Sequence, residues 1–204
     1  MDQARYVIAV MLVVTLVPAI SAWYVIHPFT RFWRRLGTVA SFCVIYSLLI
    51  SGCVLLWEFR AALVGSDLGF RPWLMLLAVP AAVLGVRIAR ARRRRLTQRI
   101  LVGVPEISRS DKGRLITDGI YGRVRNPRYL EFVLLSFVYV AFANYSGVWL
   151  LYALTFPAIH LVVLLEEPEL RERFGAEYEE YCRRVPRYVP SRRASPGSED
   201  PGLH

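Results

Sequence analysis

A short polar stretch, residues 119–129, combines side chains that could bind a carboxylate and an aromatic ring. Arg125 carries a planar guanidinium that matches a carboxylate in two parallel hydrogen bonds. Pro127 favours the start of a helix, so exposed backbone N–H groups at that point could hold an anion. Tyr121 and Tyr129 offer flat faces to a ring or a cation. An interfacial turn whose arginines extend to the lipid headgroups explains the same residues equally well, and the local pattern leaves both interpretations open.

A second group of ionisable residues lies at the end of a long apolar run. His160 and Glu167 are seven residues apart, so they share one face of a helix at a separation of two turns. Ionisable groups in a membrane helix are functional candidates by default. Glu167 could bind ribose hydroxyls or a cation, and either residue could accept a proton. For Glu166 alone we favour a hydrated helix end that Pro168 terminates.

The remaining polar residues do not suggest a metal site. Three cysteines and three histidines are spread along the chain, and no two of them have the spacing of metal ligands. The sequence also contains no glycine-rich phosphate-binding loop and no Gly-x-Ser-x-Gly nucleophile motif. We therefore expect no metal ion in the site.

Membrane helices are the elements that must position these residues. Hydrophobic residues make up 55% of the 204-residue chain and are concentrated in long uncharged runs, and a bilayer-spanning helix needs about 20 such residues. The longest run, 132–165, is too long for one span, and the turn-like Asn-Tyr-Ser-Gly sequence at 144–147 divides it into a tight helical hairpin. We expect an all-α integral membrane protein with five transmembrane helices, at about 6–26, 36–57, 71–89, 129–143 and 148–166.

Other features qualify this arrangement. The first arm of the hairpin is short for a span, so it either begins earlier or packs as a short helix against protein. The first span is expected to remain uncleaved, because its apolar run continues past the small residues of a possible signal-peptide site. Apolar residues at helical spacing predict an amphipathic helix at about 168–185, lying on the membrane or against the core. Residues 191–204, rich in Ser, Pro, Gly and charge, predict a disordered tail.

The net charge of +10 is confined to one segment. Residues 87–128 hold 13 basic and three acidic residues, and the rest of the chain is balanced. The positive-inside rule places this segment in the cytoplasm, so we expect a multi-pass protein of the cell inner membrane whose site faces the cytoplasm. Attraction to anionic lipid explains the four arginines at 92–95 better than nucleic-acid binding does, because no groove-reading helix or RNA-binding sheet accompanies them.

Three motifs, in this order, resemble those of a known family of membrane enzymes. The first is Gly-Ile-Tyr-Gly-Arg-Val-Arg-Asn-Pro-Arg-Tyr at 119–129, and the second is Glu-Glu-Pro-Glu-Leu at 166–170. The third is Phe-Gly-Ala-Glu-Tyr-Glu-Glu-Tyr-Cys-Arg-Arg-Val-Pro-Arg-Tyr-Val-Pro at 174–190. Over about residues 110–190 the chain resembles the isoprenylcysteine carboxyl methyltransferases, which are related to membrane phospholipid methyltransferases.

The resemblance implies a pocket for S-adenosyl-L-methionine at the cytosolic interface, with a lipid acceptor that enters from the membrane. The cofactor-binding residues that it implies are Gly119, Tyr121, Arg125, Asn126, Pro127, Tyr129, Glu166, Glu167, Tyr178 and Tyr181. Its catalytic candidates are Glu167, His160 and Arg187, the last as a residue that directs an acceptor carboxylate or binds the cofactor. Asn126 stands where the best-known members have His. It can still form hydrogen bonds but cannot titrate, which weakens the link to a prenylcysteine substrate.

We thus expect methyl transfer from S-adenosylmethionine to a lipid-like or small acceptor, which could be a carboxylate, an amine or a thiol. Residues 1–90 would hold the N-terminal helices and residues 91–190 the methyltransferase core. The partners would be the bilayer and a hydrophobic substrate, and the oligomeric state stays open. One alternative is an NADPH-dependent sterol or lipid reductase, which has a similar Arg-x-Pro-x-Tyr stretch but is typically longer. The other is a non-catalytic membrane protein that binds lipid through its basic segment.

Overall fold

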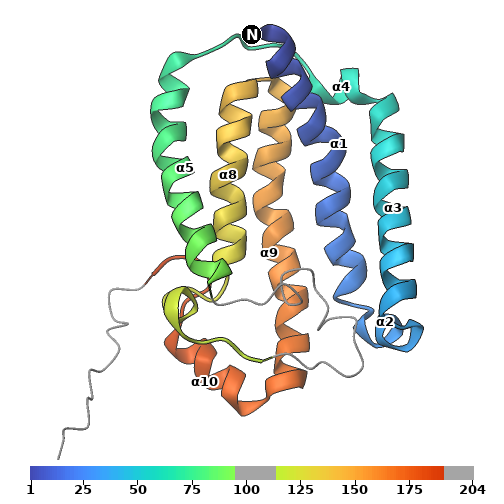
Figure 1. Ribbon diagram of the computed structural model, residues 1–204, viewed down its shortest axis with the longest axis vertical. Helices are drawn as coiled ribbons and strands as arrows, with labels where there is room; N and C mark the ends of the chain where they lie inside the picture. Colours follow the sequence, from blue (N-terminus) through green and yellow to red (C-terminus); the bar gives the residue numbers. More distant parts are fainter. Residues whose placement is uncertain (95–113, 191–204) are drawn as a thin grey trace, which may run out of the picture.

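The computed structural model describes residues 1–94 and 114–190 and has the expected all-α membrane architecture. Five long helices lie side by side (Figure 1). They are α1 (Asp2–Ile26), α3 (Thr38–Glu58), α5 (Pro72–Arg93), α8 (Pro127–Ala143) and α9 (Ser146–Phe174). The shorter elements are α2 (Thr30–Leu36), α4 (Arg60–Val64), the 3-10 helix η1 (Gly119–Gly122) and α10 (Ala176–Arg184). Much of the basic segment and the predicted tail lie outside the described residues.

The two ends of the helix bundle differ in what they hold (Figure 1). One end of the bundle holds the end of α5, the start of α8 and the whole of α10. We call it the motif end, because it carries the motifs at 119–129 and 166–190. The N-terminus, α4 and the α8–α9 turn lie at the opposite end, which we call the far end. The fold therefore brings motifs that are about 40 residues apart in the sequence to the same end of the bundle.

Four of the long helices, α1, α3, α5 and α9, are long and apolar enough to cross a membrane. Helix α8 has 17 residues, or about 26 Å at 1.5 Å per residue, and the hydrocarbon core of a bilayer is about 30 Å thick. It begins at Pro127, two residues before the expected start, and packs closely on α5. A Cβ atom on Gly85 of α5 would lie 2.8 Å from Cδ2 of Leu135. The first hairpin arm is thus a short helix that packs against protein.

The turn between α8 and α9 lies where the Asn-Tyr-Ser-Gly sequence predicted it. Asn144 adopts a left-handed conformation (φ 53°), and its side-chain amide donates to the carbonyl of Gly69 at 2.6 Å. The indole of Trp149 in turn donates to Oδ1 of Asn144 at 2.8 Å. Gly147 must lack a side chain, because a Cβ atom there would lie 1.9 Å from the carbonyl oxygen of Leu63. The close approach of these backbones fixes the hairpin against α4.

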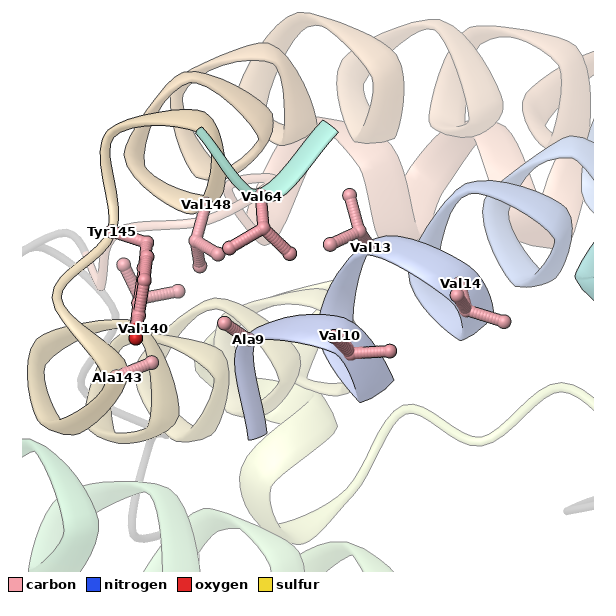
Figure 2. Packing of buried hydrophobic residues seen from close by; sticks show 9 residues of the cluster. All are labelled: Ala9, Val10, Val13, Val14, Val64, Val140, Ala143, Tyr145 and Val148. Atoms are coloured by element: carbon pink, nitrogen blue, oxygen red, sulfur yellow. The ribbon is translucent and has the colours of Figure 1, made fainter. Parts of the chain in front are cut away.

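The largest apolar cluster packs under this turn and joins α1 to the hairpin. Figure 2 shows its buried residues, which come from α1, α4, α8, the turn and α9: Ala9, Val10, Val13, Val14, Val64, Val140, Ala143, Tyr145 and Val148. Arg5, only 1% exposed, lies beside them and donates through Nε to the carbonyl of Ala143 at 3.1 Å. Its guanidinium also pairs with Asp67 and Asp2. The far end is therefore closed by a buried arginine as well as by apolar packing.

The polypeptide after the hairpin differs from the expected single amphipathic helix. Helix α9 continues through Pro168 to Phe174, so that proline does not terminate it. The break occurs at Gly175 (φ 55°), after which α10 runs to Arg184. The predicted apolar stripe still forms one cluster, with Tyr178, Tyr181 and Val185 buried against Leu170 and Phe174. The stripe was expected to lie either on the membrane or against the core, and it packs against the core.

Candidate functional site

Glu167 is the centre of a cluster of charges at the motif end. Its side chain is 5% exposed and contacts arginines from three segments of the chain. Arg187 donates from Nε and Nη2 to its two oxygens, both at 2.8 Å, in the bidentate geometry that is strongest for this pair. Arg125 lies at 3.3 Å and Arg171 at 3.7 Å. Three guanidinium groups thus surround one carboxylate. They leave an excess of positive charge, since within residues 1–94 and 114–190 only Arg171 of the three has a further acidic partner, Glu179 at 2.7 Å.

The segment 185–188 lies against the first motif. The backbone N–H of Arg125 donates to the carbonyl of Pro186 at 2.8 Å, and that of Asn126 donates to the carbonyl of Arg187 at 3.1 Å. The N–H of Tyr129 is also used, by the carbonyl of Asn126. These three backbone N–H groups are therefore not free to hold an anion. They hold the C-terminal segment and the helix start instead.

A buried donor of Arg125 has no such partner. The Arg125 side chain is 10% exposed, and among the described residues its Nε has no hydrogen-bond partner. Its Nη1 contacts both Glu167 and the sulfur of Cys182. A buried N–H without an acceptor is costly, and a ligand carboxylate is an acceptor of matching charge. The site therefore fits a ligand that brings an anionic group to Arg125.

Tyrosines form the wall behind Arg125. Tyr178 and Tyr181 are each 3% exposed, and the hydroxyl of Tyr181 donates to the backbone carbonyl of Tyr121 at 2.7 Å. Burial raises the pKa of Tyr121 to about 12 and raises the pKa of Tyr178 and of Tyr181 as well. All three phenols are therefore neutral at physiological pH. They can supply ring faces and hydroxyl hydrogen bonds, and they cannot act as phenolate bases there.

The other residues expected in the cofactor site have different surroundings. Tyr129 donates its hydroxyl to Oε2 of Glu166 at 2.9 Å and so joins α8 to α9. Pro127 is fully buried at the first position of α8, where its fixed φ suits a helix start. Asn126 is the residue before that helix and is half-buried. Gly119 has a positive φ of 60°, so its backbone conformation alone accounts for glycine at the start of η1.

His160 is not in contact with Glu167. It is exposed on α9, and its Nδ1 lies 3.1 Å from the hydroxyl of Tyr188. Tyr188 follows Arg187, whose guanidinium binds Glu167. His160 and Glu167 are therefore connected through the C-terminal segment, which lies along α9 and contacts both of them.

Two further charged clusters were not expected from the sequence. Arg92 of α5 and Glu131 of α8 form a buried bidentate ion pair, with distances of 2.8 and 3.1 Å. Nδ1 of the buried His27 lies 3.3 Å from Oε2 of Glu169. Glu169 also pairs with Arg34 at 3.0 Å. The rule that an ionisable residue in a membrane helix is a candidate would have selected Glu131, four residues after the start of α8.

Comparison with known proteins gives one match. A family model described as phospholipid methyltransferase matches residues 71–177, which is more than half of the chain. The matched region begins beside α5, includes the α8–α9 hairpin and ends within α10. No curated protein and no solved structure matches the chain. The family implies a membrane methyltransferase. Because the family model covers the hairpin and two of the three motifs in full, we conclude that the chain belongs to the phospholipid methyltransferase family.

Proposed function

We propose that this protein transfers a methyl group from S-adenosyl-L-methionine to a lipid-like or small acceptor at the membrane interface. The observation that carries the proposal is the buried, unpartnered Nε of Arg125 in a cluster that holds more positive than negative charge. The methionine part of the cofactor ends in a carboxylate, which such a cluster would bind. Membership of the phospholipid methyltransferase family supports the same assignment.

The residues of the site have distinct proposed roles in holding the cofactor. Arg125 would bind the carboxylate through its planar fork. Glu167 has two carboxylate oxygens that can accept hydrogen bonds, and it would bind the ribose hydroxyls when they replace one of its arginine contacts. Tyr178 and Tyr181 would provide the apolar wall. Asn126 and Glu166 would add hydrogen bonds from the two neighbouring helices.

The bound cofactor would supply an activated methyl group, so the protein needs mainly to orient the acceptor and exclude water. Arg187, whose side chain is 37% exposed, is placed to bind either the cofactor or an acceptor carboxylate. A carboxylate acceptor is already ionised and needs no base. For an amine acceptor His160 is the better base, because three arginines stabilise the ionised form of Glu167 and make its carboxylate a poor proton acceptor.

The arginines also support an orientation for the site. Arg90, Arg92 and Arg93 end α5 at the motif end, and Arg34 and Arg35 end α2 there. The positive-inside rule places such residues in the cytoplasm. We assign the motif end to the cytoplasmic side of the cell inner membrane, where S-adenosylmethionine is available.

Cofactor binding to the detergent-solubilised full chain tests the proposal. Isothermal titration with S-adenosylhomocysteine should show binding, and titration with NADPH should show none. Glu167→Gln should weaken S-adenosylhomocysteine binding about tenfold, which corresponds to ~1.4 kcal/mol. The matched control is Glu172→Gln, also on α9, whose carboxylate pairs with an exposed arginine at the surface. Binding of NADPH alone would favour the reductase, and binding of neither compound would overturn both enzyme assignments.

A further inference from the structure

A cavity of about 480 Å³ lies between α1, α8 and α9, beside the charge cluster described above. Such a volume is within the range of about 300–1,000 Å³ that is usual for small-molecule sites. Most of its wall is aliphatic or aromatic. The side chains that define the apolar part include Leu12, Leu16, Ile20, Phe132, Leu135 and Val162. We call this space the chamber. Its apolar wall fits a hydrocarbon chain.

The chamber is elongated along the helices. On α1 it extends from Leu12 to Trp23 and on α8 from Arg128 to Tyr139, which in each case is 12 residues with a rise of about 16 Å between the first and the last. One leaflet of a bilayer occupies about half of the ~30 Å hydrocarbon core. The chamber therefore has the length of one lipid chain in one leaflet.

Among the described residues that line the chamber, charged side chains occur only at one end, the motif end. Arg92 and Glu131 are each 8% exposed and neutralise one another in their bidentate ion pair. The guanidinium of Arg128 lies 4.2 Å from the centre of the Trp23 ring, and within residues 1–94 and 114–190 it forms no ion pair. With two arginines and one glutamate, this end of the wall carries a net charge of +1.

The charged end of the chamber adjoins the proposed cofactor site. Tyr129 lines the chamber and donates its hydroxyl to Glu166, the neighbour of Glu167. A headgroup beside Arg128 would thus lie next to Tyr129, the side chain that links the chamber to the proposed cofactor site. Among the described residues of the wall no other side chain offers a charge for a headgroup, since the rest of the lining is apolar apart from Ser136 and the hydroxyls of Tyr129 and Tyr139.

We infer that the chamber binds an amphiphile with an anionic head and a hydrocarbon chain, with the head at Arg128 and the chain between α1, α8 and α9. That this ligand is the methyl acceptor rests on the proposed function. Arg128 is then the residue that determines specificity, because its charge is not neutralised by the Arg92–Glu131 pair. A cationic head would be repelled by the net positive charge, and an uncharged head could accept a hydrogen bond from Arg128 but would form no ion pair with it.

A matched series of probes tests the charge preference. The full chain in phosphatidylcholine nanodiscs is first loaded with cis-parinaric acid, a fluorescent fatty acid, and binding is read by energy transfer from tryptophan. Palmitate, hexadecanol and hexadecylamine, which share one chain and differ in head charge, then displace it. Palmitate should displace the probe at a concentration about tenfold lower than hexadecanol, and hexadecylamine should be the weakest competitor.

Three variants locate the effect. Arg128→Gln should abolish the preference for palmitate over hexadecanol. Ser136→Leu, which fills part of the chamber, should weaken displacement by all three compounds. Leu150→Ala is the matched control, because Leu150 lies on α9 and is 62% exposed, and it should leave displacement by all three compounds unchanged. If Ser136→Leu prevents folding, the half-buried Arg128 still provides the decisive variant. Equal displacement by the three compounds, or an unchanged preference in Arg128→Gln, would overturn the inference.

The result is separable from that of the proposed function. Ser136 is not part of the cofactor site, so Ser136→Leu should keep the affinity for S-adenosylhomocysteine. Palmitate preference without S-adenosylhomocysteine binding would support the chamber and overturn methyl transfer as the function. S-adenosylhomocysteine binding without palmitate preference would overturn the chamber and leave the proposed function intact.

Discussion

The two members of the Glu167–Arg187 ion pair should contribute very differently to stability, although they share the same two hydrogen bonds. Replacing Glu167 by Gln leaves Arg125 buried, at 10% exposure, without a carboxylate. Removing one member of a buried ion pair typically costs about 3–5 kcal/mol. Arg171 and Arg187 are 44% and 37% exposed and can be hydrated, so we take the lower value, about 3 kcal/mol.

The reverse replacement, Arg187→Gln, leaves Glu167 with two arginines, and it removes a partly exposed partner. Its cost should be that of a surface ion pair, about 1 kcal/mol. For a chain of this size 1 kcal/mol shifts the unfolding temperature by about 2–4 °C. Glu167→Gln should therefore lower the unfolding temperature by about 6–12 °C and Arg187→Gln by about 2–4 °C.

Thermal unfolding in detergent, followed by tryptophan fluorescence, measures both shifts. Glu172→Gln, whose pair with Arg31 is exposed on both sides, is the control and should change the temperature by no more than about 2 °C. Equal shifts for the two variants, or a larger shift for Arg187→Gln, would refute the view that Glu167 is the centre of the cluster and Arg187 a peripheral partner.

Three further outcomes follow from the same contacts. Arg125→Gln should weaken S-adenosylhomocysteine binding about tenfold in a calorimetric titration, whereas the exposed Arg123→Gln should not; equal losses would contradict the role of the buried Nε. Burial raises the pKa of Tyr121 from 10 to about 12, so the contribution of the neutral phenol to stability is complete below pH 10 and is lost as the pH rises through 12. Ultraviolet titration of tyrosinate should show this late ionisation, and a pKa near 10 would indicate an exposed ring. Gly147→Ala should destabilise the hairpin by more than about 2 kcal/mol in thermal unfolding, because the new Cβ meets the Leu63 carbonyl. A variant as stable as the original protein would show that the backbones at Gly147 and Leu63 can move apart.

Hydropathy was sufficient to predict the architecture because a bilayer imposes a simple length rule. The runs at 6–26, 36–57 and 71–89 correspond to α1, α3 and α5, and the turn at 144–147 is where the hairpin bends. Proline was a poorer guide. Pro168 did not end α9, and the chain instead breaks at Gly175, where the positive φ that ends the helix is easily adopted by glycine.

The motifs predicted which residues lie together better than they predicted how they pair. Tyr178, Tyr181, Arg125 and Glu167 do meet at one end of the bundle. Helical spacing placed His160 near Glu167, but it could not show that the C-terminal segment lies along the helix and contacts both. Long-range pairs of this kind depend on the fold and leave no periodic signal in the sequence.

The chamber was not predicted because its charged residues look ordinary in the sequence. Arg92 is one of a run of four arginines, and topology alone explains such a run. Only the packing of α5 on α8 distinguishes it, by burying it against Glu131. Arg128 likewise belongs to the first motif but differs from its neighbours by lying over Trp23 of α1.

The buried Arg5 has a consequence for how the protein is made. Its Nε bonds to the carbonyl of Ala143, which is 138 residues later in the chain, and its guanidinium also pairs with Asp2 on its own helix and with Asp67, which follows α4. When the first helix leaves the ribosome, Asp2 is the one of these three partners that has already been synthesised. Asp67 follows once α4 has been made, and the carbonyl that Nε bonds is supplied only by the last hairpin. Completion of the far end is therefore a late step in biogenesis, because the hydrogen bond that joins α1 to the hairpin can form only after Ala143 has been made.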